Sequence, residues 1–568
     1  MSHFTSACNL KPLSPSNSTA LQDTMAGDKT YIDISRAKCE QRDRLIRDEW
    51  KISQKLALGN NVLEVPRTCG VLSEREINIT EYNDALDIIE KIRQQAYTAE
   101  EVTIAFCKRA AIAQQLTNCL TEIFFEEAIE RARQLDKERA VSPSAPLKPL
   151  HGLPISLKDS FNIPGLDSTI GMTYFASKPA TEYSALPKLL LDLGAVLYCK
   201  TNVPQTMMTA DSDNNVFGRT LNPSNLKLTA GGSSGGEGSL IAMKGSVLGI
   251  GTDIAGSIRI PSVCNGIYGA RPSSGIVPFA GQQSPEDPGM PGIEVVAGPM
   301  ATSMRACSFF MKTIMSAEPW RYDSSCLHLR WQGQLNSRKP RIGVVFDDGL
   351  YTPFPPVRRA IQEAAQKLRN SGVDVVELRL PNVAEAVGIT YGMFALDGCQ
   401  FVQDLIKAGK EPEVESVKRV NLAAIPKSSL QDYMDLNAGR RKLQAVYHDF
   451  WLGNNLDALI LPPAPQTATP FDEWGPISYT MLWNFLDYPA TIIPTGRVQE
   501  SDVVDGEESA LYGEADVKNY KLCFQDDSPE TYRDAPLSIQ VVGMRQEDEA
   551  LAEIAGLVDS ILNHSETG

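Results

Sequence analysis

The most constraining feature of this 568-residue chain is a glycine- and serine-rich stretch at residues 230–261, AGGSSGGEGSLIAMKGSVLGIGTDIAGSIRIP. Of the eight residues 231–238, five are glycines and two are adjacent serines, Ser233 and Ser234. Another serine, Ser257, follows a compact apolar run. Because glycine permits tight turns and close backbone approach, the stretch predicts a place where backbone groups and hydroxyls converge.

Two interpretations of this stretch need no catalysis. In the first it forms only tight turns, and Ser234 with Glu237 makes a capping box at a helix start. In the second it binds phosphate at a helix N-terminus. The phosphate patterns fit poorly, because Glu237 stands where the Walker pattern needs lysine and Ile254 stands where G-x-G-x-x-G needs glycine.

Two further interpretations are catalytic. GGSSG matches the nucleophile-elbow pattern G-x-S-x-G centred on Ser233, which would need His328 or His448 as its base. The alternative places the nucleophile at Ser257, beside backbone amides that can bind an oxyanion. Histidine is scarce, with five in the chain, so a lysine made neutral by burial is the alternative base. Lys158, at the end of the apolar segment LPISLK, is the candidate for that lysine.

Strand and helix patterns alternate along the chain, which predicts an α/β fold with a parallel or mixed sheet covered by helices. Residues 81–97 place Ala85, Ile88, Ile89 and Ile92 on one helical stripe. The next helix is predicted to start at a capping box. The pair forming that box is Thr98 and Glu101. The segments VLGIGTD, RIGVVF, LDALILP, ATIIPTG and LSIQVVG are further predicted strands.

Composition limits the class of protein. A net charge of -16 argues against a nucleic-acid partner, and no window reaches the apolar length of a membrane span. The eleven cysteines form no C-x-x-C pair, so neither a metal site nor a disulfide framework is indicated, and a reduced, cytoplasmic protein is expected. We predict a flexible tail at residues 1–42, one domain at 43–562 with its catalytic core at about 150–280, and an acidic exposed insertion at about 499–517.

The motifs together resemble the amidase signature family, and within it the fungal general amidases of the acetamidase type. HGLPISLKDSF, KTNVPQTMM, FGRTLNP and the long segment from residue 231 to 273 carry the family resemblance, while GVLSEREINITE and SIQVVG extend it toward the ends. The resemblance implies a single large α/β/α domain around a twisted mixed sheet, and a Ser–cis-Ser–Lys triad. It implies no cofactor and no metal.

The resemblance assigns a role to each site residue. Ser257 would be the nucleophile that forms the acyl-enzyme, Ser233 the bridging serine after a cis peptide, and Lys158 the base. The remaining roles are substrate contact through the main chain for Met207, an oxyanion hole from the amides of Ile254, Ala255, Gly256 and Ser257, orientation by Ser234, and bracing of the loop by Asp253 and Arg259.

One position departs from the family pattern, because Ala255 stands where GTDIGGS has glycine. If its φ is positive, the methyl group strains the oxyanion loop, whereas a negative φ tolerates alanine. The expected reaction is hydrolysis of small carboxamides to a carboxylic acid and ammonia, in nitrogen scavenging or specialised-metabolite biosynthesis. The sequence leaves three other functions possible: a glutamine-dependent amidotransferase subunit, an inactive scaffold, and an esterase that uses Ser233. It also allows a homodimer.

Overall fold

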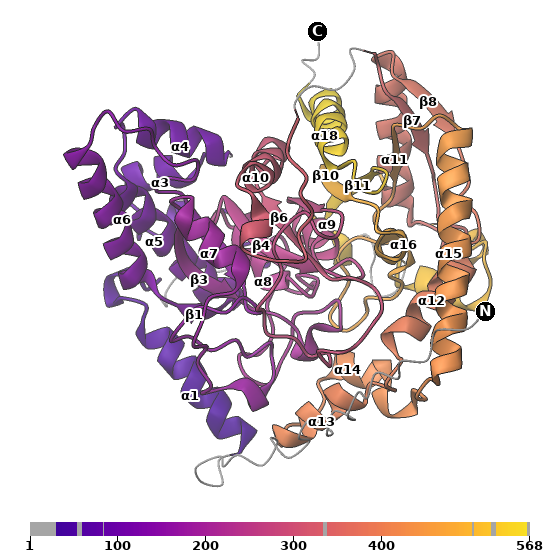
Figure 1. Ribbon diagram of the computed structural model, residues 1–568, viewed down its shortest axis with the longest axis horizontal. Helices are drawn as coiled ribbons and strands as arrows, with labels where there is room; N and C mark the ends of the chain where they lie inside the picture. Colours follow the sequence, from indigo (N-terminus) through magenta and orange to yellow (C-terminus); the bar gives the residue numbers. More distant parts are fainter. Residues whose placement is uncertain are drawn as a thin grey trace, which may run out of the picture.

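One large mixed sheet organises the chain. The computed structural model describes residues 30–53, 59–82, 84–332, 338–502, 505–523 and 530–564. Within them, eleven strands form a single sheet in the order β1-β3-β2-β4-β6-β5-β10-β11-β9-β7-β8, which runs across Figure 1 from the N-terminal half to β8. The strands are β1 (Leu120–Ile123), β2 (Pro154–Lys158), β3 (Val196–Thr201), β4 (Leu248–Asp253), β5 (Tyr268–Arg271), β6 (Val296–Ala301), β7 (Arg341–Val344), β8 (Asp374–Glu377), β9 (Ala458–Leu461), β10 (Ala490–Arg497) and β11 (Pro536–Val542).

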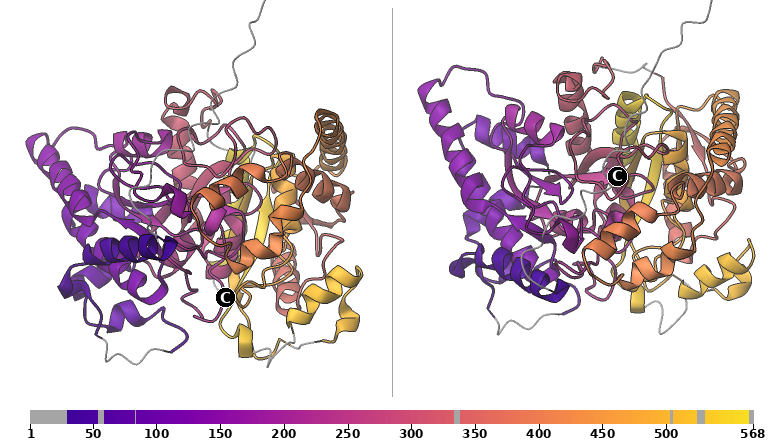
Figure 2. Two further views of the ribbon diagram at one scale, coloured as in Figure 1. Left: turned by 90° about the horizontal axis from the view of Figure 1, so that it is seen from below. Right: turned by 60° about the horizontal axis from the view of Figure 1, so that its bottom comes forward.

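Helices cover both faces of this sheet, as the α/β/α prediction requires. They are α1 (Tyr31–Arg44), α2 (Val65–Thr68), α3 (Glu74–Thr80), α4 (Ala85–Arg93), α5 (Ala99–Thr117), α6 (Phe125–Val141), α7 (Ala185–Asp192), α8 (Gly235–Ala242), α9 (Arg259–Asn265), α10 (Met304–Ser316), α11 (Pro355–Asn370), α12 (Val383–Phe394), α13 (Gln400–Ala408), α14 (Glu415–Val420), α15 (Leu430–Gly453), α16 (Ser478–Leu486), α17 (Glu514–Tyr520) and α18 (Asp548–Asn563). Seen from below, α13 and α14 lie over the middle of the molecule, between the purple N-terminal helices and the yellow C-terminal elements (Figure 2, left).

The sheet is parallel where β2 lies between β3 and β4, and antiparallel from β4 through β6 and β5 to β10. This confirms the predicted mixed sheet. The predicted strand segments and the first two helices are also found. The α4 stripe is buried, and Thr98 caps α5 in a capping box with Glu101.

Side-chain alternation along the central strands separates an apolar face from a polar one. On β2, Ile155 and Leu157 join the largest hydrophobic core. Ser156 and Lys158 instead make hydrogen bonds to groups of the glycine-serine segment. Because successive strand residues point to opposite faces, the polar residues of β2 all approach α8 and its preceding loop. The parallel strands β2 and β4 also end at the same edge, where ligands bind in open α/β sheets.

The predicted tail at 1–42 is wrong at its C-terminal boundary. Residues 1–29 lie outside the described residues, but helix α1 begins at Tyr31 and is packed on the domain. Ile34, Lys38 and Arg42 are four residues apart, so they share one helix face, and all three are buried. Lys38 Nζ reaches Glu122 Oε1 at 2.5 Å and Asp167 Oδ2 at 2.8 Å, which fixes α1 against the sheet.

The acidic segment at 499–517 is not simply an exposed insertion. Where the structure describes it, its carboxylates bind groups elsewhere in the domain. Asp502 accepts two hydrogen bonds from Arg359 of α11, and the fully buried Asp516 accepts from the amide and hydroxyl of Thr352 at 2.8 and 2.6 Å. The acidic composition therefore reflects pairing with α11 and its preceding loop as well as exposure.

None of the helices within the described ranges combines the length and the apolar composition needed to cross a membrane.

Lys38→Met is expected to lower the free energy of unfolding by about 3–5 kcal/mol, because it leaves two buried carboxylates without their cation. Urea denaturation measures this loss. Arg36→Met is the control on the same helix, since the pair between Arg36 and Asp33 is exposed and worth about 0–1 kcal/mol. Equal losses for the two variants would contradict the anchoring role of Lys38.

Candidate active site

Lys158 meets the glycine-serine segment at the carboxyl end of β2. Its side chain is fully buried, and Nζ lies 2.7 Å from Ser233 Oγ and 2.7 Å from Thr252 Oγ1. The peptide bond between Gly232 and Ser233 is cis, as the family resemblance implied. Thr252, at the end of β4, is a site residue that the sequence analysis missed. Its position beside Asp253 was the available signal.

Close packing explains the glycines around the two serines. A Cβ atom on Gly232 would lie 2.5 Å from the carbonyl oxygen of Thr209, and one on Gly236 would lie 2.3 Å from the amide nitrogen of Asn202. Both distances are far inside van der Waals contact. The glycines therefore let the loop and the start of α8 approach the backbone at 202 and 209, which holds Ser233 against Lys158.

Burial makes Lys158 suited to act as a base. Removal of the amine from water lowers its pKa to about 7, although the negative charges of Asp253 and Glu237 oppose the shift. A lysine with this pKa is partly neutral at neutral pH, so it can accept a proton from a hydroxyl. The prediction of a base at Lys158 thus has a physical cause in the structure.

Ser257 lies in the turn between β4 and α9, and it lines the same cavity as Ser233. Its hydroxyl has no hydrogen-bond partner among the described residues, so the contact with Ser233 that a proton relay needs is not formed in this structure. Catalytic hydrogen bonds are often longer without substrate and shorten when it binds. The Ser257 carbonyl accepts from the Ser234 amide at 3.2 Å, which ties the two serine-bearing turns together.

The four backbone amides predicted to form an oxyanion hole differ in their hydrogen bonding. The amides of Ile254, Ala255 and Ser257 donate to no group in the described part of the chain, and these three residues line the cavity. The fourth amide is different: Gly256 N–H donates to Asp253 Oδ1 at 2.9 Å. Three of the four predicted amides are therefore available to a ligand in the cavity, whereas the Gly256 amide is already paired.

The structure also answers the question raised by Ala255. Its φ is negative, so the methyl group causes no backbone strain. The left-handed position is the next one, Gly256, with φ of +132°. A Cβ there would lie 2.4 Å from Thr480 Oγ1, while that same hydroxyl donates to the Ala255 carbonyl at 2.6 Å. The glycine that this loop requires is thus at 256.

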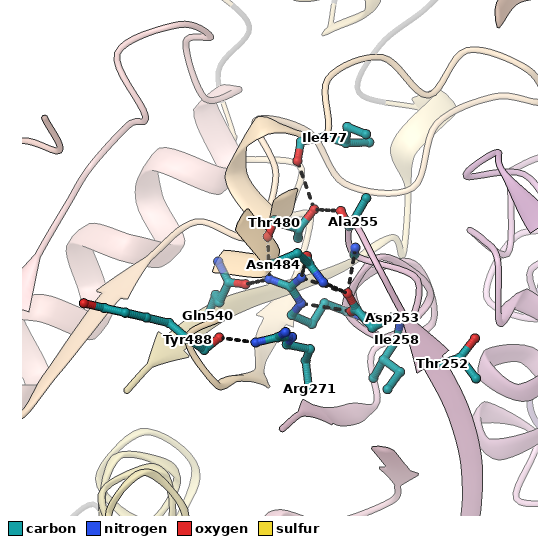
Figure 3. A network of polar contacts seen from close by, with 12 residues as sticks. Thr252, Asp253, Ala255, Ile258, Arg271, Ile477, Thr480, Asn484, Tyr488 and Gln540 are labelled. Atoms are coloured by element: carbon teal, nitrogen blue, oxygen red, sulfur yellow. Dashed lines mark hydrogen bonds and ion pairs between the residues drawn. The ribbon is translucent and has the colours of Figure 1, made fainter. Parts of the chain in front are cut away.

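Asp253 and Arg259, which were predicted to brace the loop, form a buried ion pair. Figure 3 shows Asp253 with Asn484 beside it. The side chains of the ion pair are both fully buried, and Arg259 Nη2 lies 3.0 Å from Asp253 Oδ1. Burial opposes ionisation of Asp253, but the charge and hydrogen bonds of Arg259 outweigh it and hold the pKa of the carboxyl well below its usual range. Asn484 donates to Asp253 at 2.9 Å, and Gln540 accepts from Arg259 at 2.8 Å.

Ser234 does not form the capping box considered from the sequence. Helix α8 begins after it without a side-chain cap. Its hydroxyl instead lies 3.4 Å from the Thr252 amide, and the Glu237 carboxyl binds Ser156 and Thr201. Ser234 therefore joins the serine loop to the end of β4, which fits its predicted orienting role better than a helix start.

Met207 lines the cavity from a short helical turn with unusual backbone geometry. Thr206 and Met207 both have positive φ, at 68° and 57°. The Gln205 side chain holds this turn, because its Nε2 donates to Glu411 at 2.8 Å and its Oε1 accepts from the Val414 amide at 2.9 Å. Main-chain contact between Met207 and substrate stays a prediction.

The cavity in front of the serines has a volume of about 590 Å³. Much of its wall is apolar and comes from distant segments, with Phe279, Ile293, Met393, Phe401 and Trp474 among the lining residues. Sequence reasoning missed the contributions from residues 391–425 and 472–477. No motif marks them, and they reach the site only through the fold.

The described histidines do not serve this site. His151, His328, His448 and His564 all lie away from the cavity wall. His328 stacks on Trp320, with ring centroids 4.6 Å apart, and His448 lies on α15. The nucleophile-elbow interpretation of Ser233 therefore lacks a base among the described residues.

Comparison with known proteins gives a consistent result. The family model "Amidase" matches residues 101–552. An "Amidase" of Gibberella moniliformis is 36% identical over 89% of this chain and 94% of its own length. An "Acetamidase" of Aspergillus oryzae is 34% identical over 94% of this chain and 99% of its own. Among solved structures, a "Fatty acid amide hydrolase" aligns with a TM-score of 0.85 and 29% identity, covering 94% of this chain and 95% of that one.

The rate of amide hydrolysis is expected to fall as the pH is lowered through about 7, because protonation of Lys158 removes the base. Lys158→Ala should lower kcat by about 10²–10⁴-fold while the protein stays folded. Because the pKa of Lys158 is about 7 in the folded protein and 10.5 in its ordinary state, the unfolded chain binds more protons than the folded chain between pH 7 and pH 10.5. Wild-type stability should therefore rise across that window.

His328→Ala and His448→Ala are the matched controls for this prediction, and both should keep the wild-type rate and pH profile. Near-normal turnover by Lys158→Ala, or loss of turnover in either histidine variant, would contradict the assignment of the base.

Proposed function

The chain belongs to the amidase family, and on that premise we propose that Lys158, Ser233 and Ser257 are its catalytic triad. The family assigns the chain to the hydrolases that act on amide bonds. The observation that carries the proposal is the 2.7 Å contact between Lys158 Nζ and Ser233 Oγ in a site that excludes water from the amine.

In the proposed mechanism, neutral Lys158 takes the Ser233 proton while Ser233 takes the proton of Ser257. Ser257 Oγ then attacks the carbonyl carbon of the amide, and a tetrahedral oxyanion forms. The free amides of Ile254, Ala255 and Ser257 donate to this oxyanion. The relay returns the proton to the departing nitrogen, ammonia leaves, and water hydrolyses the resulting ester on Ser257.

Two alternatives have less support. An esterase with Ser233 as nucleophile would need a histidine that the described cavity wall lacks. A glutamine-dependent amidotransferase subunit would serve a partner complex, whereas the compared fungal proteins carry the names amidase and acetamidase. Hydrolysis by the chain alone is therefore the proposed activity.

The cavity also informs the proposed substrate. Small carboxamides were the expectation from the sequence, but a volume of about 590 Å³ is in the range that holds drug-sized ligands. The apolar wall formed by Phe279, Ile293, Met393 and Phe401 favours an apolar acyl group. Carboxylates such as Glu286 also border the cavity and disfavour anionic substrates. We extend the proposal to uncharged primary amides with acyl groups larger than acetyl.

A panel of acetamide, butyramide, hexanamide, benzamide and glutamine tests this proposal by ammonia release. Each methylene group buried in the cavity contributes about 0.8 kcal/mol to the binding free energy. Therefore kcat/KM should rise about fourfold per methylene from acetamide upward. Benzamide should also exceed acetamide, and glutamine should be the poorest substrate.

Ser257→Ala is the control and should abolish ammonia release from every amide in the panel. A preference for acetamide over all larger amides would contradict the extended substrate class. Hydrolysis of glutamine only with an added partner protein would contradict the proposed function itself.

A further inference from the structure

Glu237 is a buried carboxyl group that the proposed mechanism does not use. It lies on α8, four residues after Ser233, and its side chain is fully buried. Its hydrogen-bond partners are hydroxyl groups: Ser156 Oγ donates to Oε1, and Thr201 Oγ1 lies 2.7 Å from Oε2. A carboxyl group this deep in a protein usually has a cation as its direct partner. Its position therefore requires an explanation.

The two hydroxyl partners flank the proposed base. Ser156 lies two residues before Lys158 on β2, so both side chains point to the same face of the sheet. Thr201 lies opposite Lys158 in the register of β2 and β3. Glu237 thus links the helix that follows Ser233 to both sides of Lys158. A Cβ on Gly249 would lie 1.7 Å from Glu237 Oε1, so the carboxyl also occupies the space above β4.

The surrounding hydroxyls can hold this carboxyl in either charge state. Ser156 Oγ lies 2.8 Å from Ser246 Oγ, and Ser246 Oγ donates to the Leu248 carbonyl at 3.0 Å. Each hydroxyl has one proton to donate. Ser156 can therefore donate to an ionised Glu237, or it can donate to Ser246 while a protonated Glu237 donates to Ser156. Every group keeps a hydrogen bond in both arrangements.

Lys158 is the neighbour of Glu237 that titrates near neutral pH. Burial raises the pKa of Glu237 to about 7, although Ser156, Thr201 and Lys158 oppose the shift. The other titratable groups around it are the side chains of Cys119 before β1 and of Tyr198 and Cys199 on β3. Burial raises the pKa of all three, so they stay neutral in this range. Asp253 is the second carboxylate that acts on Lys158, and it forms an ion pair with Arg259.

We propose that Glu237 is a positioning residue whose carboxylate sets the proton affinity of Lys158. The proposal rests on the proposed function, in which Lys158 is the base. When Lys158 takes the proton from Ser233, an ammonium group forms where water cannot solvate it. Ionised Glu237 stabilises that ammonium through space, and its hydrogen bonds to Ser156 and Thr201 keep the strand bearing Lys158 next to α8.

The test follows the rate at which a fluorophosphonate, which reacts with activated serine hydroxyls, inactivates the protein between pH 5 and pH 9. Wild-type protein should lose reactivity toward acid pH as Lys158 becomes protonated. We call this falling part of the pH–rate profile the acid limb. Glu237→Gln removes the charge and keeps the shape. Its acid limb should move down by about one pH unit, since loss of a nearby opposite charge lowers a lysine pKa by that order. Glu237→Asp restores the charge and should return the limb toward the wild-type position.

Ser156→Ala and Ser246→Ala form a matched pair in the same buried network. Of these two serines, only Ser156 makes a hydrogen bond to Glu237, and its hydroxyl stabilises the carboxylate. Ser156→Ala should therefore leave Glu237 neutral over a wider range and move the acid limb down, by less than Glu237→Gln does. Ser246→Ala removes an equal hydroxyl that makes no contact with Glu237. Because Ser246 accepts from Ser156 only when Glu237 is protonated, its loss favours ionised Glu237 and should not move the limb down.

An unmoved acid limb in folded Glu237→Gln would overturn the proposal and leave Glu237 with a packing role. If that variant does not fold, identical limbs for Ser156→Ala and Ser246→Ala would overturn it. Failure of the wild-type protein to react at any pH is a separate result, because it counts against the triad and not against the role of Glu237.

Discussion

The arrangement of the site depends on one constraint: the amine of Lys158 is withdrawn completely from water. An ammonium in such a place is costly, so the pKa falls and the neutral amine becomes a base. A neutral amine still needs hydrogen-bond partners, and the hydroxyls of Ser233 and Thr252 supply them at 2.7 Å. Glycines at 232 and 236 are required because these partners reach the amine only when the loop lies against the neighbouring backbone.

The same polar face contains two carboxyl groups with different environments. Asp253 is paired with Arg259 and stays ionised, and it fixes the loop by accepting a hydrogen bond from the Gly256 amide. Glu237 is bound by hydroxyls alone, and its pKa rises toward neutrality. One carboxylate thus shapes the loop after β4, and the other lies where its charge can act on Lys158, the proposed base. The difference arises from the partner, because both groups are equally buried.

Sequence patterns predicted the parts of the fold whose signals are local. The α4 stripe, the Thr98 capping box and the strand ending at Lys158 all appear as expected, because periodicity and capping act within a few residues. Long-range contacts were not predictable in this way. Thr252 and the cavity wall at 391–425 have no local motif. The tail was predicted from the polar composition of the first residues, and α1 has no apolar stripe to mark it as a helix, because its buried face includes Lys38 and Arg42. The capping box considered for Ser234 is absent because Glu237 binds Ser156 and Thr201 instead.

The proposed roles of Ser257, Ser233 and Lys158 are tested most directly by identifying which serine becomes covalently modified. Wild-type protein would be treated with a fluorophosphonate, digested, and analysed by peptide mass spectrometry. The adduct is expected on Ser257 in the wild-type protein, and no adduct on Ser257 is expected in protein that carries Lys158→Ala. A principal adduct on Ser233 would contradict the central claim, because Ser233 would then be the nucleophile and not the bridge between Ser257 and Lys158.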